Sequence, residues 1–546
     1  MKLLARLFLK PGSKVYLRQL ERDLQVSSNT VRLELNKLSE MKLINVVETE
    51  ESKIKKYIAN TVHPLYSNLR SIILKYVGVD QLLEEVFYKL GELEEVFLTG
   101  DIAEGKETPF IDLVMVGEFN KEFLFQLLER AEKLLKKKKS SPVIVAVIDS
   151  GVDLEHEDLQ GKIWTNTKEI PGNKKDDDGN GYIDDVHGWN FLGNINGKNQ
   201  EKARLEKARI VKKYGQKYED IDPETLAYDP IHDMYVNAES SLNDDVSQYE
   251  PYREMIGKGM FDKETEDYLR DQLEFNLNPN FDDRSLIGDN PDNFNDKFYG
   301  NGDAEGPDAL HGTHVAGIIG AVRGNKKGGD GVADNVLIMS VRAVPNGDEH
   351  DKDVANAIRY AVDNGAKVIN MSFGKSFSPY HEKVQEAIEY AVSKDVLMIH
   401  AAGNDASDID YTDNFPKKTV FNYVDSASRK LFLNIGANTK DSGDALVASF
   451  SNYGAMEVDV FAPGNEIYNS VPQSSYKNLQ GTSMAAPMVA GVAALLKSRF
   501  PQATMLEISD AITRTATKYD QLTSISITGG IVNVYNAARY LQNLYK

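Results

Sequence analysis

The stretch that most constrains this chain is Gly481–Pro487, with the sequence GTSMAAP, which runs directly into the small apolar residues of Met488–Leu496. A helix built from Ala, Gly and Val is apolar all round and can pack closely against a sheet. Ser483 then lies at the helix N-terminus, where unpaired N–H groups and the helix dipole favour a developing negative charge. Such a place suits a nucleophilic serine, although a buried helix with a capping serine would have the same sequence.

Two upstream segments favour the nucleophile. Residues 143–153 (VIVAVIDSGVD) form a short apolar run that reaches Asp149, which predicts a buried parallel strand with a carboxylate at its C-terminal end. His311–Gly317 (HGTHVAG) begins a second small-residue segment. A nucleophilic serine needs a base to take its proton and an acid to orient that base. Asp149, His311 and Ser483 supply these three groups in one chain order.

The three segments resemble the motifs of the subtilisin-like serine proteases (subtilases, peptidase family S8), over roughly residues 141–543. The resemblance implies an α/β fold in which a parallel sheet carries helices on both faces. It also implies a serine endopeptidase that hydrolyses peptide bonds of a protein or peptide substrate through an acyl-enzyme. Ser483 would be the nucleophile, His311 the base and Asp149 the residue that orients His311.

The same resemblance assigns residues around the substrate. In the family, an Asn after an Ala-Ala-Gly strand end supplies its side-chain amide to the oxyanion, and Asn404 stands at that place. Ser372, Phe373 and Gly374 match the strand that pairs with the substrate backbone and lines the specificity pocket. Gly403 lies near the same pocket, which in the family is open and accepts large apolar side chains.

The order of elements after His311 supports this fold class. Short apolar runs alternate with amphipathic segments, which predicts a parallel sheet with right-handed connections. The expected strands cover residues 336–344, 368–374 and 396–402, and the expected helices cover residues 352–364 and 384–393.

The gap between Asp149 and His311 is 311 − 149 = 162 positions, far longer than the family usually has, so most of it is an insertion. Residues 197–300 are charge-rich, with helical stretches at 201–218 and 263–275 and loops rich in Asn and Asp. An acidic helical insertion of this kind would cap the substrate cleft, bind a partner or cover the surface. The sequence leaves these three alternatives open.

An acidic loop precedes the insertion, at residues 176–185 (DDDGNGYIDD). Oxygen ligands at alternate positions with Gly at the sixth match the start of an EF-hand loop, but the twelfth position is His187 instead of Glu. Similar loops occur in some subtilases and imply a structural Ca²⁺. The alternative is a solvated turn rich in Asp and Asn. The expected metal ligands are Asp176, Asp178, Asn180, Tyr182 (through its carbonyl) and Asp184.

Residues 1–61 resemble a winged helix-turn-helix, with helices expected at 2–9, 16–24 and 28–41 and a hairpin at 42–57. Ser28 is the expected cap of the third helix, which enters the DNA major groove in that family. Residues 1–60 carry 12 Lys and Arg against 7 Asp and Glu, so this segment is basic in a chain of net charge −20. A module that contacts protein through a solvated basic face is the alternative. The candidate DNA-binding residues are Asn29, Thr30 and Arg32.

Residues 62–140 resemble the nucleotidyltransferase fold of small regulators, with strands expected at 93–99 and 110–116. That family places a Gly-Ser after the first strand and two metal-binding acids on the second. Here Asp101 stands where the Ser belongs and Phe110 where the first acid belongs, so only Asp112 remains. One carboxylate is a poor site for a hard cation, and we expect a degenerate domain with a structural or dimerising role. It ends in a Lys-rich linker, and the protease domain would cover residues 141–546.

Composition sets few further limits. The chain has no Cys, so disulfides and thiol chemistry are excluded. No apolar stretch reaches the roughly 18 residues of a membrane span, and no signal peptide is readable at the start. We therefore expect a cytoplasmic protein, although the protease half resembles exported enzymes. The oligomeric state stays open.

Two functional hypotheses follow. The first is a serine endopeptidase that is tethered to DNA, or regulated by it, through the winged helix. The alternative is a DNA-binding transcriptional regulator with a latent or inactive protease-like domain. A complete set of Asp149, His311 and Ser483 together with Asn404 favours an active enzyme.

Overall fold

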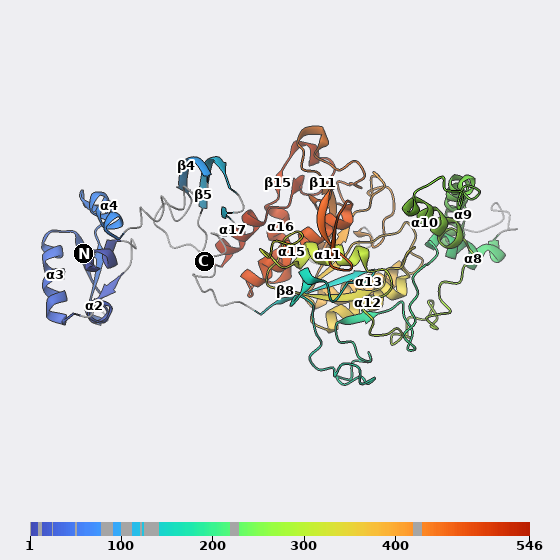
Figure 1. Cartoon of the computed structure of the whole chain (residues 1–546), viewed down its shortest axis with the longest axis horizontal. Coiled ribbons are helices and arrows are strands. Elements are labelled where there is room, and N and C mark those ends of the chain that lie inside the picture. The colour runs from blue at the N-terminus through green and yellow to red at the C-terminus, as the bar shows by residue number, and fades with distance from the viewer. Residues whose placement is uncertain are drawn as a thin grey trace. The chain divides into compact units, whose positions relative to one another are not determined.

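The computed structural model describes residues 2–8, 14–24, 26–49, 52–77, 91–99, 112–120, 123–124, 141–218, 229–418 and 429–545. The chain divides into two compact units, Met1–Lys138 and Lys139–Lys546 (Figure 1). Across the described segments, no helix is both long and apolar enough to cross a membrane.

The first unit begins with three helices and an antiparallel sheet of strand order β1-β3-β2. Ser27, one residue earlier than expected, caps α3, because its Oγ accepts a hydrogen bond from the N–H of Thr30 at 3.2 Å. Leu7, Leu20 and Leu35 form part of a small common core. The elements are α1 (Lys2–Phe8), β1 (Val15–Tyr16), α2 (Leu17–Leu24), α3 (Ser28–Glu40), β2 (Ile44–Thr49) and β3 (Ser52–Ala59).

The rest of the first unit contains helix α4 (Tyr66–Val77) and an antiparallel pair of strands, β4 (Gly91–Thr99) and β5 (Asp112–Phe119). The structure describes the second strand from Asp112 onward, and residues 110 and 111, where it was expected to begin, lie outside the described residues. Asp101, Phe110 and the Lys run 136–139 lie outside the described residues.

The second unit is built on a nine-stranded sheet of order β15-β16-β12-β11-β10-β9-β6-β8-β7. All neighbouring pairs are parallel except β15 with β16. The interior strand β6, between β9 and β8, is almost completely buried, as its continuous apolar run predicts. The strands are β6 (Val143–Asp149), β7 (Gly188–Asn190), β8 (Val336–Arg342), β9 (Val368–Met371), β10 (Leu397–Ala401), β11 (Phe432–Asn438), β12 (Val460–Pro463), β15 (Thr517–Lys518) and β16 (Gly530–Ile531).

Helices cover both faces of this sheet, which confirms the expected α/β architecture. Ala146 and Ile148 of β6 share one core with α12 and α13. Because side chains alternate along a strand, the intervening residues face the opposite side, toward α11 and α15. The elements are α11 (Leu310–Gly320), α12 (Asp351–Asp363), α13 (His381–Ser393), α15 (Thr482–Arg499), α16 (Met505–Arg514), α17 (Val534–Leu544) and the hairpin strands β13 (Ile467–Val471) and β14 (Ser475–Leu479).

The insertion is helical, as expected, and contains α8 (Glu206–Tyr218), α9 (Pro230–Tyr249), α10 (Lys263–Asp271) and the π-helical turn η4 (Gln272–Asn276). The sequence analysis missed α9, which has Asp229 as N-cap and Pro230 in its first turn. Short 3₁₀ turns complete the chain: η1 (Glu157–Leu159), η3 (Glu250–Tyr252), η6 (Gly443–Ala445) and η7 (Asp520–Leu522).

Candidate active site

Asp149 and His311 meet because a glycine lets two elements approach closely. Asp149 is the last residue of β6 and is 1% exposed. A Cβ on Gly312, in the first turn of α11, would lie 2.1 Å from the carbonyl oxygen of Gly151 and 3.2 Å from the Cβ of Asp149. His311 Nδ1 lies 2.7 Å from Asp149 Oδ1. An ionised carboxylate only accepts, so Nδ1 donates to it and Nε2 is left as the basic nitrogen.

The same contact tunes the imidazole. Burial opposes protonation of His311, but the charge of Asp149 and the hydrogen bond to it outweigh burial and raise the pKa of His311 above its ordinary value. The carboxylate of Asp308 acts in the same direction. His311 is therefore a stronger base than a free histidine.

Ser483 lies in the first turn of α15, as its motif predicts. Pro487 stands four residues later inside the helix and has no N–H, so it cannot bond to the carbonyl of Ser483. Ser372 supplies the missing donor: its Oγ donates to that carbonyl at 2.9 Å. The N-terminal turn of α15 is thereby tied to the segment that follows β9.

The hydroxyl of Ser483 bonds back to this segment. Its Oγ donates to the carbonyl oxygen of Ser372 at 3.1 Å. Within the described chain, no hydrogen bond joins Ser483 Oγ to His311. Ser372 also lines, together with Asp149 and His311, a pocket of about 250 Å³. The structure thus brings the three predicted residues to one site, with the serine hydroxyl turned toward Ser372.

Asn404 follows the end of β10, and Thr482 fixes its side chain. The Oδ1 of Asn404 accepts from the N–H of Thr482 at 2.8 Å and from the Oγ1 of Thr482 at 3.1 Å. Its Nδ2 has no protein acceptor among the described contacts, and it lies 3.6 Å from the place of a Cβ on Gly481. The amide N–H groups are therefore available beside the start of α15, where an oxyanion would form.

The glycines assigned to the specificity pocket pack against two asparagine side chains. A Cβ on Gly374 would lie 2.3 Å from Oδ1 of Asn414, and one on Gly403 would lie 2.3 Å from Nδ2 of Asn452. A side chain at either position would displace these asparagines, and Gly403 also has a φ of +100°, which favours glycine. Phe373, which lies between Ser372 and Gly374 in the sequence, is 9% exposed. Their contact with a substrate stays a prediction.

Two other histidines near the site are buried and make structural hydrogen bonds. His314 Nε2 donates to the carbonyls of Ile467 and Lys477, and burial lowers the pKa of His314 to about 4. His156 accepts from the N–H of Asp158 through Nδ1. Neither is free to act as the base.

Arg342 is a residue of the site that sequence reasoning missed. It pairs with Asp149 across β6 and β8, is 1% exposed and lines the pocket beside His311. Its Nε donates to the carbonyl of Ser150 at 3.0 Å, which fixes the chain directly after Asp149. Burial lowers the pKa of Arg342 to about 10, so it stays charged. A charged residue inside an apolar strand was the available signal.

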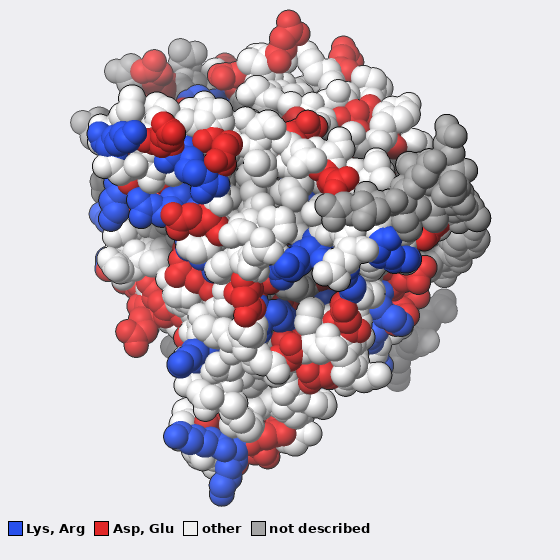
Figure 2. Space-filling view, turned by 90° about the vertical axis from the view of Figure 1, so that its right-hand side faces the viewer, with Lys and Arg blue, Asp and Glu red and all other residues white. Residues whose placement is uncertain are grey.

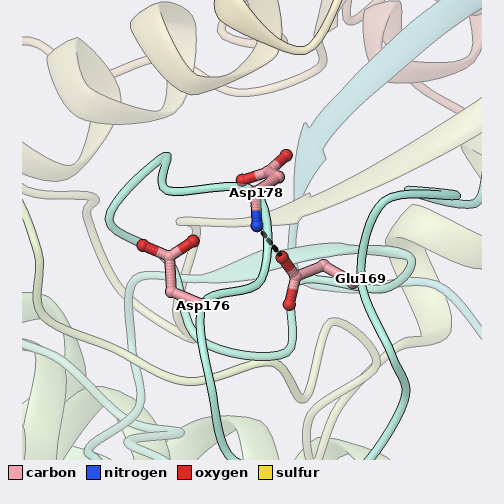
Figure 3. A group of neighbouring side chains, drawn as sticks. All are labelled: Glu169, Asp176 and Asp178. Carbon is pink, nitrogen blue, oxygen red and sulfur yellow. Dashed lines mark hydrogen bonds between the residues drawn. The ribbon is translucent and has the colours of Figure 1, made fainter.

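The acidic loop gathers only part of its predicted ligand set. Glu169, Asp176 and Asp178 each offer an oxygen within 4.8 Å of the others (Figure 3). One oxygen of Glu169 accepts from the N–H groups of Asp177 and Asp178, and the other is buried without a described partner. Glu169 precedes the Asp-rich run by seven residues, which is why the EF-hand spacing did not indicate it.

Of the other predicted ligands, the carboxylate of Asp184 lies outside this group of acidic side chains. Asp184 turns away and accepts from the N–H groups of Asn173 and Lys174. Asn180 donates its amide to Asp185, and the ring of Tyr182 packs in the core against Trp189 at 5.0 Å. The EF-hand ligand set therefore stays a prediction for Asn180 and for Tyr182, whose backbone carbonyl was the expected ligand.

Asn29, Thr30 and Arg32 are exposed on the first turns of α3. Arg32 Nη2 donates to Oδ1 of Asn29 at 2.8 Å, and the Oγ1 of Thr30 lies 2.8 Å from the Oγ of Ser27. The three side chains therefore form one polar surface at the N-terminus of this helix.

Comparison with known proteins concerns the second unit. Residues 140–529 match a family model described as Subtilase family. The Thermophilic serine proteinase of Bacillus sp. (strain AK1) is 42% identical over 236 residues, which are 42% of this chain and 52% of that protein. Thermitase of Thermoactinomyces vulgaris is 41% identical over 236 residues, 42% of this chain and 75% of thermitase. The chain thus spans about half the length of the Bacillus relative.

A solved structure of proteases from Pseudoalteromonas arctica PAMC 21717 is similar with a TM-score of 0.42 and 24% identity, over 73% of this chain and 90% of that one. The family model covers the strands and helices that carry Asp149, His311, Asn404 and Ser483. The chain belongs to the subtilase family of serine peptidases.

Proposed function

We propose that the chain is a serine endopeptidase that cleaves peptide bonds through an acyl-enzyme. One observation carries the proposal: His311 Nδ1 lies 2.7 Å from Asp149 Oδ1 in a pocket that Ser372 also lines. The hydroxyl of Ser483 is hydrogen-bonded to the carbonyl of Ser372. The relatives named thermitase and Thermophilic serine proteinase support this activity.

In the proposed reaction, the hydroxyl of Ser483 exchanges the carbonyl of Ser372 for Nε2 of His311 when a substrate arrives. His311 takes the proton as Oγ attacks the substrate carbonyl, and Asp149 stabilises the imidazolium. The oxyanion receives N–H groups from Asn404 Nδ2 and from the first turn of α15. His311 then protonates the leaving amine. In the second half of the reaction, His311 takes a proton from water as the water attacks the acyl-enzyme, and then returns a proton to Ser483 as the acyl group leaves.

The test is the intact mass of the full chain after reaction with a fluorophosphonate, beside Ser483→Ala. A single adduct on the natural chain and none on Ser483→Ala is the expected result. No adduct on a folded, intact natural chain would contradict the peptidase and favour the alternative, a DNA-binding regulator with a latent protease-like domain. Loss of the N-terminal unit in the same experiment would indicate cleavage near residues 136–141.

We also propose a structural Ca²⁺ at Glu169, Asp176 and Asp178. The buried, unpartnered oxygen of Glu169 supports this, since an uncompensated buried carboxylate is costly and oxygen ligands suit a hard cation. Calcium bound there would fix the loop before β7 and takes no part in the reaction.

We further propose that residues 1–61 form a winged helix that binds DNA through Asn29, Thr30 and Arg32. The exposure of these side chains at the start of α3 supports it. DNA binding requires that the protein is present in the same compartment as DNA, and we propose the cytoplasm. Cell fractionation would test this location. Residues 62–140 would have a structural or dimerising role, and sedimentation of the full chain would reveal a dimer.

A further inference from the structure

The insertion encloses a cavity of about 190 Å³ between α8 and the start of α12. Five cationic side chains line it: Arg204, Arg209, Lys212, Lys213 and Lys352. It is separate from the pocket beside His311, and no residue lines both. It owes its existence to the insertion, since one wall is α8.

Two polar atoms in this wall are buried and lack a described partner, Nε of Arg209 and Nε2 of His350. The two residues are 7% and 9% exposed. The nearest carboxylate oxygen to His350 Nε2, on Asp283, is 3.9 Å away, which is too far for a hydrogen bond. A buried polar group without a partner is unfavourable by about 1–3 kcal/mol, so a ligand that reaches these atoms gains hydrogen bonds that the protein itself does not use.

Positive side chains outnumber negative ones in the cavity wall, where Glu206, Asp292 and Asp351 are the acidic residues. Burial and the neighbouring charges of Arg209, Arg284 and Lys375 hold the pKa of His350 well below its ordinary value. The imidazole is therefore neutral and retains one N–H donor. The neighbouring positive charges that oppose its protonation also attract an anion.

Lys212 adds a charge that no described carboxylate balances. The other lining cations have carboxylate partners; Arg204 with Asp283 at 2.7 Å and Lys213 with Asp292 at 2.7 Å are examples. The ammonium group of Lys212 instead donates to the neutral amide of Asn280 at 2.6 Å. It therefore keeps donors and one unit of charge for a ligand.

We propose that this cavity binds a small oxyanion, a free phosphate or a carboxylate group, which accepts from Arg209 Nε, His350 and Lys212. A volume of about 190 Å³ corresponds to roughly six water molecules, enough for such an ion. Figure 2, which looks onto the side of the insertion, shows basic and acidic side chains intermixed over the surface. The selectivity thus comes from the cavity, and not from a generally basic face.

An anion here would act on the peptidase site through the chain that joins them. Arg209 also donates to the carbonyls of Asp348 at 2.9 Å and Glu349 at 3.0 Å. Two residues earlier, Asn346 lines the pocket beside His311. Binding therefore stabilises the segment that forms one wall of that pocket, although the anion site itself does not depend on the peptidase proposal.

Calorimetric titration of the full chain with inorganic phosphate, at constant ionic strength set with NaCl, tests the proposal. A saturable single site is expected, and Lys212→Met should weaken it about tenfold, the loss of one charge-assisted hydrogen bond. Lys217→Met is the matched control, since Lys217 lies on the same helix, is also exposed and does not line the cavity. It should bind as the natural chain does.

A second titration with acetate separates the sources: binding of phosphate alone assigns a free phosphate, and binding of both assigns a carboxylate-accepting site. No saturable heat with either ion overturns the proposal. Equal weakening by Lys212→Met and Lys217→Met also overturns it, because the effect would then be one of net charge. At one phosphate concentration, the thermal midpoint should rise in the natural chain and in Lys217→Met by more than it does in Lys212→Met.

Discussion

The peptidase site and the acidic loop differ in what holds their side chains. Asp149, His311 and Ser483 lie at the ends of β6, α11 and α15, three elements packed in the core. Glu169, Asp176 and Asp178 lie on irregular chain, held by turns and by hydrogen bonds among themselves. The first site is therefore fixed by the fold, whereas the second gathers three carboxylates whose charge the proposed Ca²⁺ would offset.

Ser483→Ala is the sharpest test of the fixed site. It removes the nucleophile and leaves the hydrophobic contacts of α15 in place, so peptide hydrolysis should fall by about 10⁴-fold or more with an unchanged thermal midpoint. Steady-state hydrolysis of a peptide substrate measures the loss. A large change in midpoint would mean that the serine supports the fold, and the comparison with the acidic loop would then fail.

Asn404→Ala should have the next largest effect. It removes one oxyanion donor, so kcat should fall by about 10²–10³-fold with little change in KM, a range known from another subtilase. Asn414→Ala serves as control, since the Nδ2 of Asn414 already donates to the carbonyls of Ala401 and Ala402. A matching loss in kcat for both variants would contradict the assignment.

Glu169→Gln tests the proposed Ca²⁺ site in the acidic loop. If Ca²⁺ binds there, calcium stabilises the natural chain by about 2.7 kcal/mol at a hundredfold excess over Kd, and the variant should lose this gain. Thermal melting with calcium and with a chelator measures it. Asp184→Asn is the matched control, because Asp184 lies in the same loop but outside the cluster. A chelator that leaves the natural midpoint unchanged would remove the metal.

The pH dependence of hydrolysis tests how Asp149 acts on His311. Hydrolysis needs neutral His311, and the pKa of His311 is raised by Asp149. Activity should therefore rise with pH along a limb whose midpoint lies above the ordinary histidine value of about 6.5. Asp149→Asn should move the midpoint of the residual activity downward. A midpoint below 6.5 in the natural chain would show that burial outweighs the carboxylate.

Arg32→Ala should produce the smallest effect, confined to the first unit. Loss of one phosphate contact lowers DNA affinity modestly and reduces the salt dependence by about one unit of slope. A gel shift at several salt concentrations measures both. Lys37→Ala is the control, because Lys37 lies on the same helix and pairs with Glu34. No shift of the natural chain at low salt would exclude the DNA proposal.

The sequence predicts the parts of the molecule that regular elements fix. The apolar run before Asp149 and the small-residue segments after His311 and Ser483 each became the expected buried strand or helix. The α/β class and the helical insertion followed from periodicity. These predictions succeed because burial and backbone hydrogen bonding leave such segments little choice.

What the sequence did not predict depends on contacts between distant residues. Arg342 reaches the site because β8 pairs in register with β6, and Glu169 joins the cluster because the chain folds back on residues 177–178. The carboxylate of Asp184 lies outside the cluster and accepts from the N–H of Asn173, which EF-hand spacing did not indicate. Neither strand register nor the path of an irregular loop is visible in local spacing.

Pro487 has a consequence for transplanting this chemistry. Because the proline leaves the carbonyl of Ser483 without a helical donor, the motif GTSMAAP is incomplete by itself. Grafted onto a helix in another scaffold, it would carry an orphan acceptor at a cost of about 1–3 kcal/mol. The smallest portable unit is the motif together with a hydroxyl placed as that of Ser372 is, so a designer would have to move a strand end and a helix start as a pair.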